Sequence, residues 1–368
     1  MKKIVTTGII STVTALLLAG CGGSGSSDSG SSGNVTQNSY ATTFKARSVG
    51  DQVEELMGGV IGIADEVGNG KMGDPLGSDI GSADTTLVES QFSWNSTMDF
   101  YNNILSIKHV WDGGLKAIAE SSQPAQAQTI TTQLEYALAR IVAISDSNGD
   151  ENLTTDDLIA NNGALAFRNQ ISNASGRAKI EEAISALGDL QRSLETLKTS
   201  ITPTDSDLAN AAAVIDNVIV AGYNNLGNEA NTLATALSNL AATPTEQNIE
   251  AARAQWRTTR AYWEAGEGHI FGPVDTLGVD PKVDSWPVDK TQLDGALAGW
   301  DPELSNIDGF PTTMKGFHAI EYLLFGDGSS LESAADALSR LDETKRKYLE
   351  ALGVSFAKDI SSLTDAWN

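Results

Sequence analysis

A histidine and a glutamate three residues apart, His318 and Glu321, are the strongest candidates for chemistry in this 368-residue chain. Side chains three apart lie on the same face of a helix, so the imidazole and the carboxylate can converge on one cation. Mixed nitrogen and oxygen ligands suit iron or zinc, and helix-borne pairs of this type bind metals inside other bundles. The spacing alone also fits an ion pair or a core histidine that binds no metal.

Composition limits the classes of site and partner. The chain has three histidines, which excludes a cage of many imidazoles, and it has no H-E-x-x-H sequence, which excludes the usual arrangement of a zinc protease. The formal net charge is −24, which argues against nucleic acid as a partner. This charge suits a soluble surface protein, or one that collects cations.

A second cation-binding candidate is the segment 146–157, which resembles a twelve-residue calcium loop. The side chains with oxygen at the expected positions are those of Asp146, Asn148, Asp150, Asn152, Thr154 and Asp157. Glu151 replaces the glycine that makes the sharp turn of such loops, and Asp157 is shorter than the usual bidentate glutamate. Two alternatives follow: a structural calcium site, or a polar surface loop held by Asx turns.

The first residues indicate export. Lys2 and Lys3 precede an apolar run that is too short for a membrane span of about 20 residues, as in a signal peptide. The string Leu-Ala-Gly-Cys that ends at Cys21 resembles a bacterial lipobox, which implies acylation of Cys21 and anchoring in a membrane through lipid. The next residue is not the aspartate that retains lipoproteins at the inner membrane, so the outer membrane or its periplasmic face is favoured.

The remainder of the chain is expected to be all-α. After a Gly/Ser-rich tether at 22–39, apolar residues recur at helical spacing within 49–67, 104–118, 130–144, 180–197, 208–226, 249–263 and 341–367, and no alternating strand pattern is present. Thr243 is expected to cap the helix that follows Pro244. We therefore predict two packed helical bundles, at 40–200 and 201–368, behind a signal peptide at 1–21.

Three ordered blocks in the second half carry a family resemblance. Gly316, His318 and Glu321 match the G-x-H-x-x-E motif of the imelysin-like family. Upstream, the segments 263–273 (W-E-x-x-E-x-x-x-F-G-P) and 284–289 (D-x-W-P-x-D) are similar to the blocks that precede that motif. The resemblance implies a metal-binding protein of bacterial iron uptake, and the family has also been classed as peptidases.

The order of the blocks differs from the usual one. Segments 64–71, 89–96 and 107–111 look like blocks of the family's second half, yet here they precede the G-x-H-x-x-E block. We interpret this as a circular permutation, which bundles tolerate when the chain ends lie close together at the surface. The segment 92–95 is then expected to face His318.

The resemblance and the spacing together define the expected site. His318 and Glu321 are the predicted metal ligands, and Glu267 and Asp289 are expected to supply further oxygens. The expected ion is iron or another transition metal. Side chains expected to line the site are those of Glu264, Ser93, Asn95 and Trp286. No catalytic residue is assigned. The expected function is metal binding by a lipoprotein that serves an iron-uptake system; the alternatives are a metallopeptidase and a surface interaction protein with a vestigial metal site.

Overall fold

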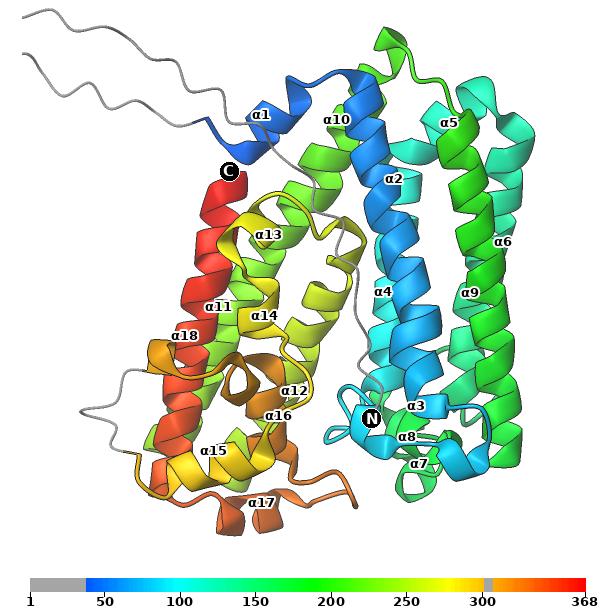
Figure 1. The fold of residues 1–368 in the computed structure, drawn as a ribbon. Coiled ribbons are helices and arrows are strands. Elements are labelled where there is room, and N and C mark those ends of the chain that lie inside the picture. The colour runs from blue at the N-terminus through cyan, green and yellow to red at the C-terminus, as the bar shows by residue number, and fades with distance from the viewer. Residues whose placement is uncertain (1–37, 301–306) are drawn as a thin grey trace, which may run out of the picture. The chain divides into compact units, whose positions relative to one another are not determined.

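The computed structural model describes residues 38–300 and 307–368, and all regular structure in these ranges is helical (Figure 1). This confirms the expected fold class. The predicted signal peptide, Cys21 and nearly all of the tether lie outside the described residues. Within them, no helix combines the length and the apolar character needed to cross a membrane.

The first bundle is built from four long helices that pack on one another, α2, α4, α6 and α9 (Figure 1). The helices of this part of the chain are α1 (Tyr40–Lys45), α2 (Val49–Asp65), α3 (Asp74–Leu76), α4 (Ser96–Val110), α5 (Lys116–Ser122), α6 (Pro124–Ser145), α7 (Thr155–Gly163), α8 (Phe167–Gln170) and α9 (Ala174–Ser200). A π-helical segment, Glu66–Gly73, joins α2 to α3. Such segments shift the register of the side chains and are frequent at functional sites.

A long helical stretch carries the chain from the first bundle to the second. Its beginning, α10 (Leu208–Val214), packs against α2, and it continues through a π-helical segment, Ile215–Val220, into α11 (Ala221–Ala242). The helix α11 packs instead against α12 and α18.

The second bundle surrounds α11, α12, α16 and α18 with short helices (Figure 1). Its helices are α12 (Glu246–Glu264), α13 (Pro273–Leu277), α14 (Asp280–Val283), α15 (Lys290–Leu297), α16 (Gly316–Phe325), α17 (Ala334–Arg340) and α18 (Glu343–Trp367). The predicted cap of α12 was wrong by two residues. Thr243 ends α11, because its N–H bonds to the Asn239 carbonyl, and the Thr245 hydroxyl accepts the Asn248 N–H at 3.2 Å as the N-cap of α12.

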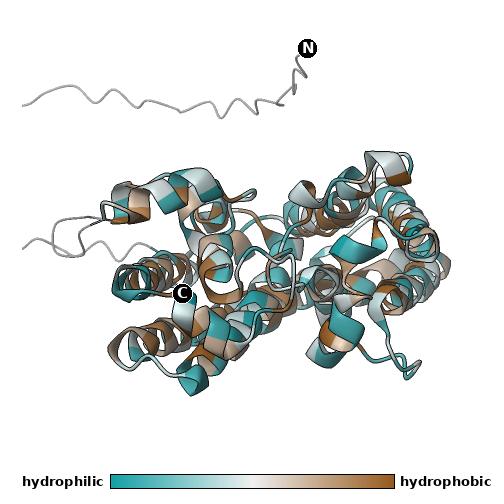
Figure 2. Ribbon diagram, turned by 90° about the horizontal axis from the view of Figure 1, so that it is seen from below, coloured by the Kyte–Doolittle hydropathy of each residue, from teal (hydrophilic) through white to brown (hydrophobic). Residues whose placement is uncertain are grey.

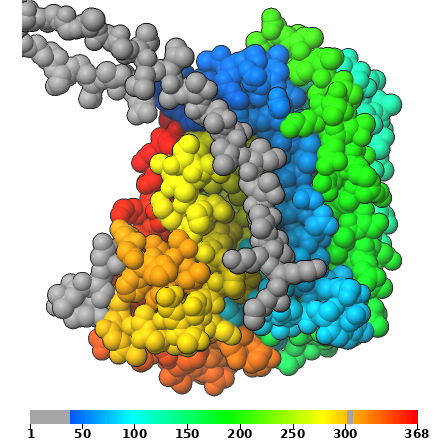
Figure 3. All heavy atoms as spheres, in the orientation of Figure 1, coloured from blue at the N-terminus to red at the C-terminus, as the bar shows by residue number. Residues whose placement is uncertain are grey.

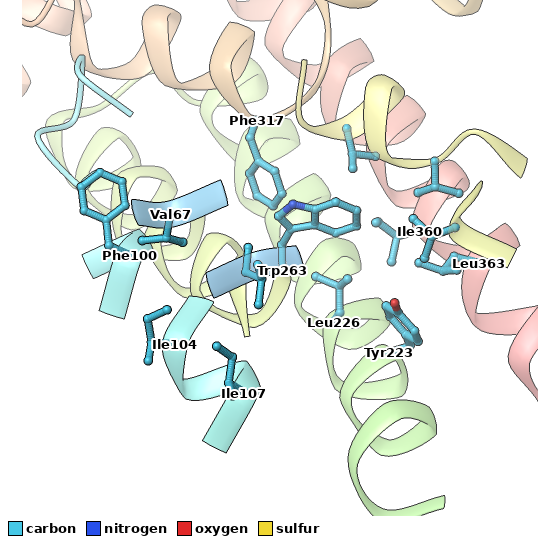
Figure 4. Packing of buried hydrophobic residues seen from close by; sticks show 14 of the residues in the cluster. Val67, Phe100, Ile104, Ile107, Tyr223, Leu226, Trp263, Phe317, Ile360 and Leu363 are labelled. Atoms are coloured by element: carbon cyan, nitrogen blue, oxygen red, sulfur yellow. The ribbon is translucent and has the colours of Figure 1, made fainter. Parts of the chain in front are cut away.

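The apolar stripes of the sequence form the core. Viewed along the helices, apolar residues turn toward neighbouring helices and polar residues toward solvent (Figure 2). In the second bundle Trp263 packs between Phe317 and Leu226, while Phe100 and Ile104 belong to the core of the first (Figure 4). Fully burying a large apolar side chain contributes roughly 1.5 to 3 kcal/mol, so these stripes supply the main driving force for the fold.

The two ends of the described body lie next to each other. The helix α1 lies beside the C-terminal end of α18 (Figure 1). The ring of Tyr40 in α1 meets that of Trp367, the last residue of α18, edge to face with their centroids 4.9 Å apart. In the space-filling view the earlier and later parts of the chain occupy neighbouring sides of the molecule (Figure 3). Adjacent ends are what a circular permutation requires, and the permutation remains a prediction.

Candidate metal centre

The helix that carries His318 and Glu321 begins at a glycine because no other residue fits there. Gly316 has a φ of 72°, and a Cβ atom at this position would lie 2.3 Å from the Val283 carbonyl oxygen. This close approach holds α16 against the end of α14, directly before Asp284. The glycine of the motif therefore places the helix of His318 beside a carboxylate from another segment.

His318 is fully buried and uses both ring nitrogens. Its Nδ1 lies 3.0 Å from Glu321 Oε2, and its Nε2 lies 3.1 Å from Asp284 Oδ1 and 3.4 Å from Glu89 Oε1. Nε2 has no well-directed hydrogen bond to either carboxylate. The imidazole is thus fixed on one side by Glu321, and its other nitrogen faces two carboxylates that can share a cation with it.

Glu321 is held by the first bundle. Its Oε1 accepts hydrogen bonds from both the backbone N–H and the hydroxyl of Ser93, each at 2.7 Å. The ring of Trp286 lies 4.8 Å from that of His318 and 5.7 Å from Phe92. The segment 92–95 therefore reaches the surroundings of His318 through Glu321 and Trp286.

Arg260, on α12, is the central cation of the site. Its guanidinium is fully buried and pairs with Glu89 at 2.5 Å, with Asp99 at 3.4 Å, and with Glu264 and Asp284. Asp284 also accepts a hydrogen bond from the indole N–H of Trp263 at 2.7 Å. One arginine therefore fixes carboxylates that come from both bundles.

Lys71, in the π-helical segment after α2, is the second buried cation. Its ammonium lies 2.8 Å from Glu267, 3.3 Å from Glu89 and 3.5 Å from Glu264. The side-chain amide of Asn103 donates to Glu264 and Glu267 as well. Glu264 and Glu267, expected near His318 from the sequence, are thus both present in the cluster, but they face Lys71.

Asp289 does not reach the cluster, and the predicted ligand set is corrected at this point. Its side chain is exposed and caps α15 by accepting the Gln292 N–H at 2.9 Å. Asp284, at the other end of the D-x-W-P-x-D string, lies beside His318 instead. The role of Glu321 also differs, because its carboxylate orients the imidazole rather than facing the same space as Nε2.

The charge balance of the cluster favours an additional cation. Within residues 38–300 and 307–368, six carboxyl groups (Glu89, Asp99, Glu264, Glu267, Asp284 and Glu321) contact only three basic side chains, Lys71, Arg260 and His318. Burying unpaired negative charge is costly, so some of these groups hold protons.

The pKa values of these groups are shifted as the excess of carboxyl groups over basic side chains requires. Burial raises the pKa of Glu264 to about 8, although Arg260 and Lys71 oppose the shift. Burial and the neighbouring charge of Glu264 raise the pKa of Glu267 well above its ordinary value. Burial alone would lower the pKa of His318, but its carboxylate partners outweigh burial and hold that pKa well above 6.5. Protons therefore occupy the site in the absence of a metal ion.

An acidic cavity connects the cluster to the surface. It has a volume of about 360 Å³ and is lined by six carboxyl groups and one lysine, namely Glu66, Asp74, Glu89, Glu267, Asp280, Asp284 and Lys71. Clefts in which charges of one sign predominate raise the local concentration of oppositely charged ions. This cavity provides a path by which a cation can enter.

Two groups of side chains in the described part of the chain are close enough to share a metal ion: Glu89, Asp284 and His318, and Glu264, Glu267 and Asp284. The first has one imidazole and two carboxylates, a donor set that suits iron, zinc or manganese and lacks the sulfur that copper(I) prefers. In the second group, Lys71 already contacts both glutamates, and the pKa of each is raised, so protons compete with a metal ion there. The first group fits a metal ion better.

The predicted calcium loop connects α6 to α7, and its carboxylates are turned to the loop itself. Asp146 accepts backbone N–H groups of Asn148, Gly149 and Glu151. Asp157 accepts from Ser147 and Thr154 as part of the N-terminal cap of α7. The structure thus has the Asx turns of the second alternative, and calcium binding remains a prediction.

Of the remaining residues that were expected to line the site, Asn95 donates to Asp99 at 2.6 Å and Trp286 packs on His318. Four members of the site were not predicted from the sequence: Glu89, Asp284, Arg260 and Lys71. Each lies within or beside a block that resembles the family, and that was the signal available in the sequence.

Comparison with known proteins agrees with the fold and the motif. Residues 30–194 and 219–368 match the family model described as imelysin, Peptidase M75. Over 153 residues the chain is 33% identical to iron-regulated protein A of Synechococcus elongatus, a match that covers 42% of this chain and spans only 38% of that relative. The fold resembles the crystal structure of an imelysin peptidase from Bacteroides ovatus, with a TM-score of 0.67 and 27% identity, covering 82% of this chain and 89% of that one. This chain belongs to the imelysin family.

Proposed function

We propose that this protein binds a transition metal, with iron favoured, through His318, Asp284 and Glu89, and that it serves iron uptake as a lipid-anchored lipoprotein on the outer membrane or its periplasmic face. The observation that carries the proposal is the position of His318 Nε2, which faces two carboxylates without a well-directed hydrogen bond. The similarity to a relative named for its regulation by iron supports the choice of metal. Delivery to an uptake system is part of the same proposal.

The surroundings of His318 are suited to reversible binding. Glu321 fixes the tautomer and orientation of the ring through Nδ1, as carboxylates beside metal-bound histidines commonly do. Arg260 holds Asp284 and Glu89 in place, so the three donors are organised before an ion arrives. An ion that enters by the acidic cavity displaces protons from the site, which makes its affinity depend on pH.

Metal titration of the purified protein tests this function. After chelation, iron(II) and zinc(II) should bind in a one-to-one complex, more weakly at pH 5 than at pH 7.5, because protons compete for the ligands. A peptidase assay with and without chelator should detect no cleavage that depends on metal. Absence of binding would refute the proposal, and chelator-sensitive cleavage would favour a metallopeptidase.

The metal-free protein should lose stability as the pH rises from about 5 to about 9. The pKa of Glu264 is raised from 4.5 to about 8, so the stability linked to its protonated form is complete below 4.5 and is lost as the pH passes through about 8. The raised pKa of His318 acts in the same direction, because its contribution is complete below 6.5 and is lost as the pH rises from there through its raised pKa. Chemical denaturation in the presence of chelator measures this dependence.

Glu264→Gln provides the matched variant for that experiment, because glutamine keeps the shape of the protonated side chain without titrating. The decline of stability with pH should be shallower in this variant. A free energy of unfolding that increases from pH 5 to pH 9 in the metal-free wild type would contradict the charge balance described above.

A further inference from the structure

A second cavity, of about 720 Å³, lies between the two bundles and is lined by α12, α7 and the segment between α16 and α17. Its apolar lining comes from Phe325, Leu331 and Ile159. The charged side chains that line it are two arginines, Arg253 and Arg257, and two glutamates, Glu250 and Glu332. A volume of this size is typical of small-molecule sites. None of the side chains that line it belongs to the candidate metal centre.

The two arginines of this cavity differ in their partners. Arg253 is buried and pairs with Glu250 at 3.2 Å and with Glu332 at 3.7 Å. Arg257 donates to the Asn95 side-chain oxygen at 2.6 Å and to the Ser93 carbonyl at 2.7 Å, both of which are neutral. Among the described residues, no carboxylate forms an ion pair with Arg257. The hydrogen bonds of its guanidinium at the wall of the cavity therefore go to neutral oxygens.

The apolar wall lies next to this charge. The guanidinium carbons of Arg257 and Arg253 lie 5.0 and 5.3 Å from the centre of the Phe325 ring. Leu331 is 47% exposed, which is unusual for a large apolar side chain beside a cavity and leaves it available to a ligand. Burial lowers the pKa of Arg257 to about 10, although the charges of Glu321, Asp99 and Glu250 oppose the shift.

We propose that this cavity binds a small organic acid, whose carboxylate pairs with Arg257 and whose apolar body packs on Phe325 and Leu331. An arginine has five N–H donors, and the two hydrogen bonds to Asn95 and Ser93 leave donors for an incoming carboxylate. Pairs of arginine and carboxylate are among the strongest hydrogen-bonded contacts in proteins. The proposal does not depend on metal binding, and its test uses the metal-free protein.

The probe is 4-phenylbutyrate, compared with the neutral 4-phenylbutanamide, in ligand-observed NMR titrations of the chelated full chain. The acid should bind saturably and roughly tenfold more tightly than the amide, because only the acid pairs with Arg257. Equal binding of the two compounds, or no saturable binding of the acid, would overturn the proposal.

Substitutions at Ala254 locate the site without removing Arg257. Ala254 is an exposed residue that lines the cavity three positions before Arg257 on α12, so a glutamate introduced there can pair with the arginine. Ala254→Glu should bind the acid roughly tenfold more weakly than Ala254→Gln, which adds a side chain of the same size without the charge. Equal binding by these two variants would overturn the proposed role of Arg257. The comparison leaves Arg257 in place, so it does not depend on whether a substitution of Arg257 itself folds.

Discussion

Replacing His318 or Asp284 by alanine should weaken metal binding by about a hundredfold or more, because each substitution removes one of three donors that face the same point. Glu321→Ala should have a smaller effect, roughly ten- to a hundredfold, since Glu321 orients the imidazole and does not face the ion. Calorimetric titration with iron(II) or zinc(II) measures these affinities.

Asp289→Ala is the matched control for this series. Asp289 lies five residues after Asp284 in the same family-like string, but it is exposed and caps a short helix. Its replacement should leave metal affinity unchanged. If Asp289→Ala weakened binding as much as Asp284→Ala, the geometry of the site described here would be wrong.

Arg260→Met should destabilise the metal-free protein by roughly 3 to 5 kcal/mol, because it leaves buried carboxylates without their common partner. Arg260 is fully buried and pairs with four of them, two from each bundle, namely Glu89, Asp99, Glu264 and Asp284. Denaturant unfolding under chelating conditions gives the free energy. Adding metal should restore part of the loss, since the ion supplies positive charge to the same carboxylates.

Two further variants make this experiment decisive. Arg192→Met removes an exposed ion pair with Asp189, and it should change the free energy of unfolding by less than about 1 kcal/mol. Arg260→Lys keeps the charge and should be intermediate, even if Arg260→Met does not fold. If Arg260→Met lowered the free energy of unfolding no more than Arg192→Met, the buried carboxylates would not depend on Arg260.

The fold could be predicted from the sequence because the pattern that indicates each helix, the spacing of its apolar residues, is local. Apolar residues at helical spacing, such as Ile180, Leu187 and Leu194 in α9, are buried as the pattern indicates. Helix ends were less certain. Thr243 and Thr245 are both good N-caps by residue type, and only the end of the preceding helix decides which of them is used.

The site was predictable only in part, because its members are brought together by tertiary packing. His318 and Glu321 are three residues apart, and helix geometry alone places them on one face. Glu89 and Lys71 lie more than two hundred residues before them and come from the other bundle, so no local spacing relates them to His318. In the string that contains Asp284 and Asp289, residue type could not distinguish the carboxylate of the site from that of a helix cap.

The central claim is that His318 Nε2, Asp284 and Glu89 hold one metal ion, and a crystal structure of the protein loaded with iron tests it most directly. Anomalous difference density measured at the iron edge should show one peak bonded to these three side chains, with Glu321 still hydrogen-bonded to His318 Nδ1. Fully loaded crystals with the peak elsewhere, or with no peak at His318, would contradict this account.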